Sequence, residues 1–202
     1  MANKGKYYES QFEEATIELL HESHWQYAFG DDIHRKYTDP LIEEDLRNFL
    51  AVQYKDKNLI TSEMDSIVAN LRNTGGQNDY YALRNAFLLY RDGYDFAYSD
   101  GRDNPFRLEY IDFEHPDHNI FRCVNQFVME QGRENRRPDI LLFINGIPVC
   151  IIELKNPTNQ NATIRDAHTQ ICTRYMRDIP SLLKYCALAV ISDGAKNALG
   201  ST

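Results

Sequence analysis

The sequence predicts an α/β fold, a central mixed β-sheet flanked by helices, with a helical N-terminal part. Helical patterns fill the first half of the 202 residues, and short apolar, β-branched stretches follow in the second half. A further helical pattern separates the last of these stretches from the others, and this order is typical of an α/β sandwich. We expect a helical part over 1–92 packed on a core over 93–202, together one compact domain and a fragment of a longer chain.

Helices in the first half are predicted from apolar spacing and from residues that favour helix ends. They cover residues 8–24, 41–52, 62–73 and 79–91. Asp39 with Pro40 is a favourable start for the second helix, because an N-cap side chain is followed by proline in the first turn. Ser62 with Asp65 resembles a capping box at the start of the third helix.

Strands are predicted in the second half, where apolar and β-branched residues come in short runs. They cover residues 106–113, 119–129, 139–144, 147–154 and 185–192, and a helix is predicted over 163–178. Asn145-Gly146 separates two of these runs and is a strong hairpin signal. Because both of those runs are apolar on both faces, we expect two central strands that helices bury.

Three ionisable residues interrupt this apolar hairpin, namely Asp139, Glu153 and Lys155. Glu153 and Lys155 are two residues apart, so on a strand they share a face. A carboxylate in a buried strand is costly unless it is paired or coordinates a metal ion. In one interpretation Glu153 and Lys155 form a salt bridge and Asp139 caps a turn; the hairpin context favours a functional site instead.

The register of the hairpin decides whether the two carboxylates meet. A strict two-residue turn would place Asp139 opposite Ile152 and leave Glu153 on the other face. One bulge, or a three-residue loop, would pair Asp139 with Glu153. Pro148 cannot donate a hydrogen bond to the ladder, which favours an irregular turn. We therefore predict the irregular register.

Two carboxylates that meet in a buried site repel each other unless a cation lies between them. Oxygen ligands beside a phosphate substrate suit Mg²⁺, which polarises a phosphoryl oxygen and lowers the pKa of a bound water. A lysine beside the scissile phosphate can stabilise developing charge and help to orient or deprotonate the water. Asp139, Glu153 and Lys155 together therefore predict metal-dependent hydrolysis of a phosphodiester.

The net charge of −8 argues against a free-standing, non-specific DNA-binding protein, which normally has a basic surface. A nuclease is not excluded, because metal ligands are acidic and other domains or subunits can hold the DNA. The dense basic cluster Arg133, Arg136 and Arg137 comes directly before Asp139. It is interpreted either as a solvated loop or as a contact to DNA phosphates.

Nothing in the sequence indicates a membrane protein or a secreted one. The apolar runs are too short to span a bilayer, and the first residues contain no apolar core of a secretion signal. The four cysteines are scattered without a CxxC pair and are expected to be reduced core residues. We therefore expect a cytoplasmic protein.

The string HPDH raises the question of a separate metal site, formed by His115, Asp117 and His118. No second cluster at metal-ligand spacing accompanies it in the sequence. A surface turn is therefore the favoured interpretation of this string.

The residues around the hairpin resemble those of a known family. Asp139, Glu153 and Lys155, with Pro138 before the aspartate, match the PD-(D/E)xK nuclease motif. The longer string is similar to the N-terminal nuclease domain of the R subunits of type I restriction enzymes. The similar features are NQF (125–127), RRPDILLFINGIPVCIIELKNP (136–157), DAHTQICTRYMRDIP (166–180) and YCALAVISDG (185–194), with ESQFEEATIELL (9–20) matching more loosely.

The resemblance implies a restriction-endonuclease-like fold and Mg²⁺-dependent cleavage of double-stranded DNA in a bacterial or archaeal cell. Asp139 and Glu153 would be the metal ligands and Lys155 the catalytic lysine. A glutamate of the first helix often joins such sites. Glu9 and Glu13 are the candidates here, although a solvated helix face explains them equally well.

Members of this nuclease group commonly add a glutamine and a tyrosine from the next helix, in a QxxxY motif. Gln170 and Tyr175 stand in this position, but one residue farther apart. On an α-helix, positions i and i+5 diverge by about 140°. Gln170 can then face the site while Tyr175 points elsewhere, and Arg174 holds the i+4 position.

The resemblance also implies parts that this chain lacks. The full R subunit would join the nuclease to an ATP-driven DNA translocase, yet no GxxxxGK[ST] phosphate loop occurs in these 202 residues. A specificity subunit and a methyltransferase subunit would recognise and methylate the DNA. Two other functions stay open: another nuclease with the same motif, such as a repair exonuclease or junction resolvase, and a non-catalytic module that binds DNA or protein.

Overall fold

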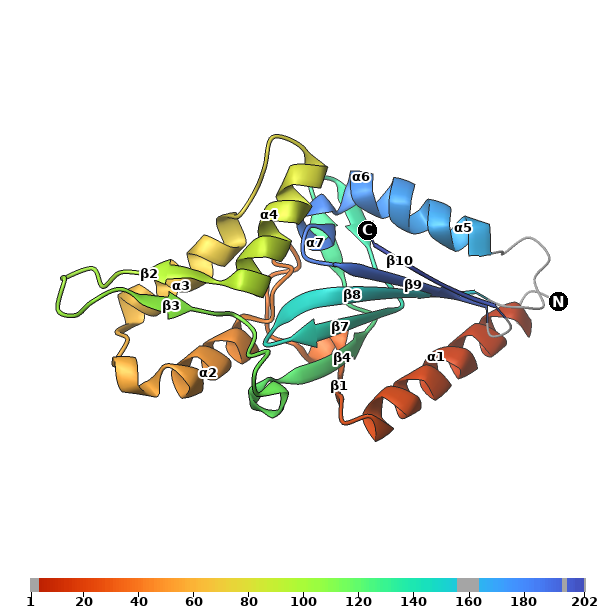
Figure 1. Cartoon of the computed structure of the whole chain (residues 1–202). Coiled ribbons are helices and arrows are strands. Elements are labelled where there is room, and N and C mark those ends of the chain that lie inside the picture. Colours follow the sequence, from red (N-terminus) through yellow and green to blue (C-terminus); the bar gives the residue numbers. More distant parts are fainter. Residues whose placement is uncertain (1–3, 156–163, 194–195, 202) are drawn as a thin grey trace.

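The computed structural model describes residues 4–155, 164–193 and 196–201 (Figure 1). Its helices are α1 (Lys4–Glu22), α2 (Glu43–Gln53), α3 (Thr61–Asn73), α4 (Asp79–Asp92), α5 (Ile164–Thr169), α6 (Met176–Asp178) and α7 (Pro180–Leu183). Its strands are β1 (Gln26–Phe29), β2 (Tyr94–Phe96), β3 (Phe106–Leu108), β4 (Phe121–Asn125), β5 (Met129–Gln131), β6 (Glu134–Arg136), β7 (Ile140–Ile144), β8 (Ile147–Leu154), β9 (Leu188–Ser192) and β10 (Asn197–Gly200). A π-helical turn, Gln170–Tyr175, joins α5 to α6.

Six strands form one mixed sheet, in the order β1-β4-β7-β8-β9-β10. β1 runs parallel to β4 and β8 runs parallel to β9, whereas the other neighbours are antiparallel. The hairpin β7–β8 therefore lies in the middle of the sheet, where both of its strands have a partner on either side. The predicted α/β fold, a mixed sheet flanked by helices, is confirmed.

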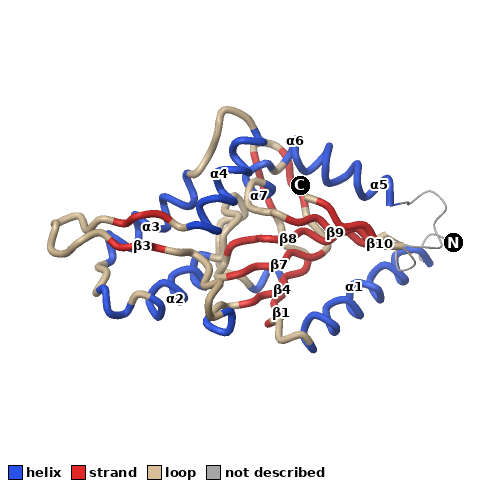
Figure 2. The backbone as a smooth tube through the Cα atoms, viewed as in Figure 1, coloured by secondary structure: helices blue, strands red, loops and turns tan. Residues whose placement is uncertain are grey.

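Helices cover both faces of this sheet (Figure 2). On one face, Phe12 and Leu20 of α1 pack near Ile152 of β8. On the other face, Ile171 of the π-helical turn belongs to the same apolar cluster as Ile151. The neighbours Ile151 and Ile152 thus point to opposite faces, as alternation along a strand requires. Both faces are apolar because both are buried, as the sequence predicts for a central strand.

Helices α2, α3 and α4 form a third apolar cluster at the end of the sheet where the β7–β8 turn lies (Figure 1). The start of α2 lies close to the hairpin turn, since the N–H of Ile42, the residue before the helix, donates to the carbonyl of Gly146 at 2.9 Å. Gly146 has a positive φ of 76°, and a Cβ there would lie 2.1 Å from the Ile42 carbonyl oxygen. Only glycine combines this backbone conformation with this approach.

The prediction that the first half is purely helical is wrong at β1. This four-residue strand pairs with β4 in parallel, with Phe29 opposite Asn125, so residues near the N-terminus belong to the main sheet. Gly30 ends the strand, and a Cβ there would lie 2.6 Å from the carbonyl oxygen of Gln126. A strand this short shows no periodicity that could reveal it in the sequence.

Two predicted helix starts also differ from the structure. The Asp39 side chain accepts from the Leu41 N–H at 3.1 Å, but α2 begins only at Glu43, because the chain first packs against the hairpin turn. At α3 it is Glu63, and not Asp65, whose carboxylate accepts from the N–H of the residue before the helix, Ile60.

Among the described residues, no helix is both long and apolar enough to cross a bilayer.

Candidate active site

The β7–β8 hairpin has the irregular register that the sequence predicts. Its turn is the two-residue type, and beside it Ile144 pairs with Ile147. Farther along the strands, however, Ile140 pairs with Ile152, because the register shifts by one residue between Leu142 and Phe143. The shift leaves Val149 as the extra residue of a β-bulge.

The bulge decides where the two carboxylates lie. Continuing the shifted register by one residue places Asp139 opposite Glu153, on the face of the sheet that the π-helical turn covers. Without the bulge, Asp139 would lie opposite Ile152 and Glu153 would point away from it. The structure therefore brings Asp139 and Glu153 to one face, at the end of the hairpin that is distant from its turn.

Glu153 is fully buried, and its carboxylate has polar partners on both oxygens. The Tyr175 hydroxyl donates to Oε1 at 2.7 Å, and the Gln170 amide donates to Oε2 at 2.7 Å. Burial raises the pKa of Glu153 above its ordinary value, against the opposing effect of Lys155 and of the tyrosine. The site thus holds a buried carboxylate that is hydrogen-bonded yet costly to ionise.

The π-helical turn explains how Gln170 and Tyr175 both reach Glu153. A π-helix bonds residue i to residue i+5, so residues five apart lie on one face instead of diverging. The Gln170 amide also donates to the Tyr175 hydroxyl at 2.7 Å. The expectation from α-helical geometry that Tyr175 points elsewhere is therefore wrong, and Arg174, at the i+4 position, is exposed.

Lys155 lies directly after β8 and points back toward the same carboxylate. Its Nζ is 3.3 Å from Oε2 of Glu153 and donates to Oε1 of Gln170 at 3.2 Å. Its backbone N–H donates to the Ser192 carbonyl at 2.8 Å, which continues the pairing of β8 with β9. The ammonium group is thus positioned by a rigid sheet rather than by a loop.

Asp139 has an unusual electrostatic environment. Its Oδ2 accepts from the Leu154 N–H at 2.8 Å. Burial, together with the nearby charge of Glu153, raises the pKa of Asp139 from 3.8 to about 7. A carboxylate whose ionisation is hindered by a neighbouring carboxylate is typical of catalytic or metal-binding sites.

Helix α1 contributes a third acidic side chain, Glu13. Its carboxylate accepts from the Asn125 amide at 2.8 Å and from the Gln126 amide at 3.0 Å. The charge of Glu13 also contributes to the raised pKa of Asp139. Glu9 lies on the same helix, but its side chain is outside the described part of the chain.

Asn125 and Gln126 were not predicted as site residues, although they belong to the string NQF that carries part of the family resemblance. Gln126 has a positive φ of 55°, which is uncommon outside glycine and often marks a functional position. Its backbone N–H donates to the Asp139 carbonyl at 3.2 Å. The same residue therefore orients Glu13 and holds the backbone of Asp139.

The predicted basic cluster divides between two environments. Arg136 is half-buried, with Nε 2.7 Å from Asp178 and a terminal nitrogen 2.7 Å from Glu134. Arg133, in the β5–β6 turn, and Arg137 are exposed. Arg136 thus holds the β5–β6 hairpin against α6, and the two exposed arginines have the freer access to a polyanion.

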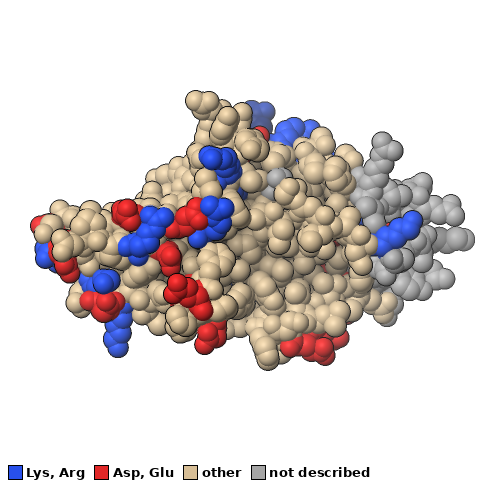
Figure 3. All heavy atoms as spheres, in the orientation of Figure 1, with Lys and Arg blue, Asp and Glu red and all other residues tan. Residues whose placement is uncertain are grey.

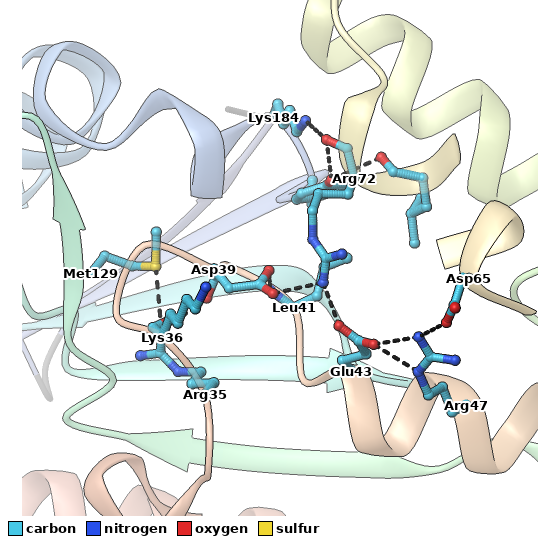
Figure 4. Close-up of polar contacts among 12 residues, drawn as sticks. Arg35, Lys36, Asp39, Leu41, Glu43, Arg47, Asp65, Arg72, Met129 and Lys184 are labelled. Carbon is cyan, nitrogen blue, oxygen red and sulfur yellow. Dashed lines mark hydrogen bonds and ion pairs between the residues drawn. The ribbon is translucent and has the colours of Figure 1, made fainter. Parts of the chain in front are cut away.

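A cavity of about 820 Å³ lies away from this site, between α2, α3 and α7. Several of its charged side chains form ion pairs: Arg72 donates to Asp39 at 2.7 Å and to Glu43 at 2.6 Å (Figure 4). Lys184 donates to the carbonyls of Arg72 and Thr74. The cavity wall contains neither carboxylate of the hairpin nor Lys155, so its network joins helices rather than forming the candidate site.

Comparison with known sequences places this chain in a family. A family model described as "Type I restriction enzyme R protein N terminus" matches residues 6–202. The HindI endonuclease subunit of a type I restriction enzyme from Haemophilus influenzae is 30% identical over 96% of this chain and 19% of its own length. A protein of Methanocaldococcus jannaschii described as the MjaIXP endonuclease subunit is 31% identical over 94% of this chain and 19% of its own.

A third relative is the EcoprrI endonuclease subunit of Escherichia coli, 34% identical over 50% of this chain and 31% of its own length. The chain spans about a fifth of the length of the first two relatives, so the similarity concerns one part of much longer proteins. Because the family model covers nearly all of it, the chain belongs to the family of type I restriction enzyme R protein N termini.

Proposed function

We propose that this chain is a Mg²⁺-dependent endonuclease domain that hydrolyses phosphodiester bonds of double-stranded DNA. The observation that carries the proposal is the bulged register of the central hairpin, which brings Asp139 and Glu153 to one face beside Lys155. Family membership supports it, because the relatives are endonuclease subunits of type I restriction enzymes.

The donor set fits a magnesium ion. Asp139 and Glu153 supply carboxylate oxygens, which Mg²⁺ prefers, and Glu13 is a third acidic group nearby. Burial raises the pKa of both carboxylates, and the nearby charge of Glu153 raises that of Asp139 further, a cost that a bound cation would remove. When bound, Mg²⁺ supplies Lewis-acid polarisation of the phosphate and an acidified water.

The side chains of this site then have distinct tasks. Asp139 and Glu153 hold the ion. Lys155, an ammonium on a rigid strand end, offsets the negative charge that develops on the phosphate oxygens. Gln170 keeps Lys155 and Glu153 in place by contacting both, at 3.2 Å and 2.7 Å. Tyr175 fixes the rotamer of Glu153 through its 2.7 Å hydrogen bond.

The rest of the proposed function belongs to the longer protein. We infer that the full subunit also contains an ATP-dependent DNA translocase and assembles with methyltransferase and specificity subunits. The net charge of −8 supports this division of labour, because a domain with this charge attracts DNA poorly by itself. A motor that delivers the DNA would compensate for it.

The proposal is tested with the full-length subunit assembled in its restriction complex. Asp139→Ala and Lys155→Ala should each reduce linearisation of a supercoiled plasmid by at least about 100-fold, because each removes a group that acts on the transition state. Hydrolysis of ATP in the same reactions should stay within about twofold of wild type, since the motor is a separate part.

Lys55→Ala is the matched control, because Lys55 is an exposed lysine on the 3-10 turn after α2. It should cleave like wild type. Glu153→Gln should weaken Mg²⁺ binding, measured by calorimetry on the isolated chain. Plasmid cleavage that survives both Asp139→Ala and Lys155→Ala would show that the nuclease site lies elsewhere.

A further inference from the structure

A second cluster of ionisable side chains lies near the turn of the β7–β8 hairpin, at the opposite end from Asp139. Asp112, His115 and His118 each offer one donor atom, and these atoms all lie within 4.8 Å of one another. The two histidines come from the string HPDH. The third member is not Asp117, the sequence candidate, but Asp112, three residues before His115.

Asp112 is held in place before any ligand binds. It is 5% exposed, and its Oδ1 accepts from the backbone N–H groups of Glu114 at 3.0 Å and His115 at 2.8 Å. Its Oδ2 accepts from the Gln53 amide at 3.1 Å and faces the two imidazoles. Hydrogen bonds that orient a carboxylate in this way are the usual support of a metal ligand.

The spacing of the donor atoms suits a small divalent ion. Oδ2 of Asp112 is 3.0 Å from Nδ1 of His118 and 3.6 Å from Nδ1 of His115. Zinc–ligand bonds of about 2.0–2.1 Å in a tetrahedron put neighbouring donors roughly 3.3 Å apart. These two distances lie on either side of this value and all three donors lie within 4.8 Å of one another, so the imidazoles would rotate toward each other to bind an ion.

The two imidazole rings are accessible to solvent and already lie side by side. Their side chains are 61% and 50% exposed, and their rings stack at 4.9 Å between centroids with an angle of 17°. Stacking brings the two Nδ1 atoms to the same side, toward Asp112. Their exposure leaves room for water as a further ligand, so an ion can enter from solvent.

We propose that Asp112, His115 and His118 form a binding site for Zn²⁺ or a similar first-row transition-metal ion, separate from the nuclease site. Imidazole nitrogen favours zinc, copper and nickel, whereas Mg²⁺ prefers oxygen alone. The site has three protein ligands and an open position for water. Its chemistry thus differs from that of the carboxylate pair on the hairpin.

The ion acts on the loop that anchors the hairpin turn. Asn119 accepts from the Asp112 N–H at 2.9 Å and from the buried Asn145 amide at 2.8 Å. Asn145, in the turn, also donates to the Tyr110 carbonyl at 2.9 Å. Joining Asp112 to His115 and His118 closes this loop, so metal binding stabilises the folded state.

Calorimetric titration of the metal-stripped chain with Zn²⁺, in excess Mg²⁺ to occupy the hairpin carboxylates, tests the proposal. Wild type should bind one equivalent at the loop site, and its unfolding temperature should rise with Zn²⁺. His118→Ala and His115→Ala should each weaken this binding at least about 30-fold and remove the rise. Both residues are exposed, so the variants should fold, which circular dichroism checks.

His21→Ala is the matched control, because His21 is an exposed histidine of α1 far from the loop in the sequence. It should bind Zn²⁺ like wild type. Equal binding by wild type and the double variant His115→Ala/His118→Ala would overturn the proposal, as would no binding by wild type. The cluster would then be a set of hydrogen bonds only. The nuclease proposal is untouched by either result, because its site has other ligands.

Discussion

At the scale of single residues, the raised pKa of Asp139 sets the role proposed for it against the stability of the fold. Its carboxylate is partly buried beside Glu153, and its pKa is raised to about 7. The folded chain therefore retains a proton on Asp139 at pH values where the unfolded chain has lost it. Stability from this group is fully present below pH 3.8 and is lost as the pH rises through about 7.

Asp139→Asn should remove this pH dependence. The asparagine oxygen can still accept from the Leu154 N–H, but the side chain carries no charge. With a chelator at pH 8, the variant should exceed wild type in free energy of unfolding by on the order of 2 kcal/mol, or about 5 °C in unfolding temperature. At pH 4 the two should unfold at nearly the same temperature. Thermal unfolding followed by circular dichroism measures both.

Addition of Mg²⁺ at pH 8 should make wild type more stable than Asp139→Asn, because only wild type retains both carboxylates that would hold the ion. A wild type that remains as stable at pH 8 as at pH 5 without metal would contradict the assigned pKa shift. The variant should also lose DNA cleavage, which would make Asp139 a residue kept for function at a cost in stability.

At the scale of elements, two single-residue irregularities build the site. The β-bulge in β8 turns Glu153 toward Asp139, and the π-helical turn brings Tyr175 to the same carboxylate as Gln170. Each adds one residue to a regular element and changes which side chains share a face. Both are placed where polar groups must converge inside an apolar layer.

Deletion of Thr173, an exposed residue of the π-helical turn, should leave the site intact. Gln170 and Tyr175 would then be four residues apart, and a regular α-helix would keep them on one face. The variant should unfold within about 3 °C of wild type, and cleavage by the assembled complex should stay within about threefold.

Insertion of one alanine after Thr173 is the matched opposite change, since it would move Tyr175 out of reach of Glu153. It should lower the unfolding temperature and reduce cleavage at least about 10-fold, because a buried carboxylate loses a donor. If the deletion variant folds normally but is as inactive as the insertion variant, the π-helical geometry itself is required.

The sequence predicts the elements whose signals are local. The hairpin could be found because Asn145-Gly146 and two apolar runs are adjacent, and its register because Pro148 disfavours a regular ladder. The π-helical turn could not, since the Glu153 carboxylate that Gln170 and Tyr175 both contact lies 17 and 22 residues earlier in the chain. The partnership of Glu13 with Asn125 joins residues 112 positions apart and leaves no local pattern.

At the scale of the whole molecule, the distribution of charge bears on how the proposed nuclease would meet DNA. Acidic and basic side chains mix over the end formed by α2, α3, β2 and β3, on the face seen in Figure 3. The described part of that face has no broad area of basic charge alone, which agrees with a net charge of −8. Such a surface gives DNA little electrostatic attraction.

The isolated chain should therefore bind duplex DNA weakly. The test is fluorescence anisotropy with a duplex of about 30 base pairs at physiological salt, with Ca²⁺ in place of Mg²⁺. The Kd should be above about 100 µM, which is the weak end of non-specific DNA binding. Arg133→Ala with Arg137→Ala should weaken binding further at low salt, if these exposed arginines contact phosphates. A Kd in the low micromolar range at physiological salt would contradict the division of labour, because the domain would then hold DNA without its motor.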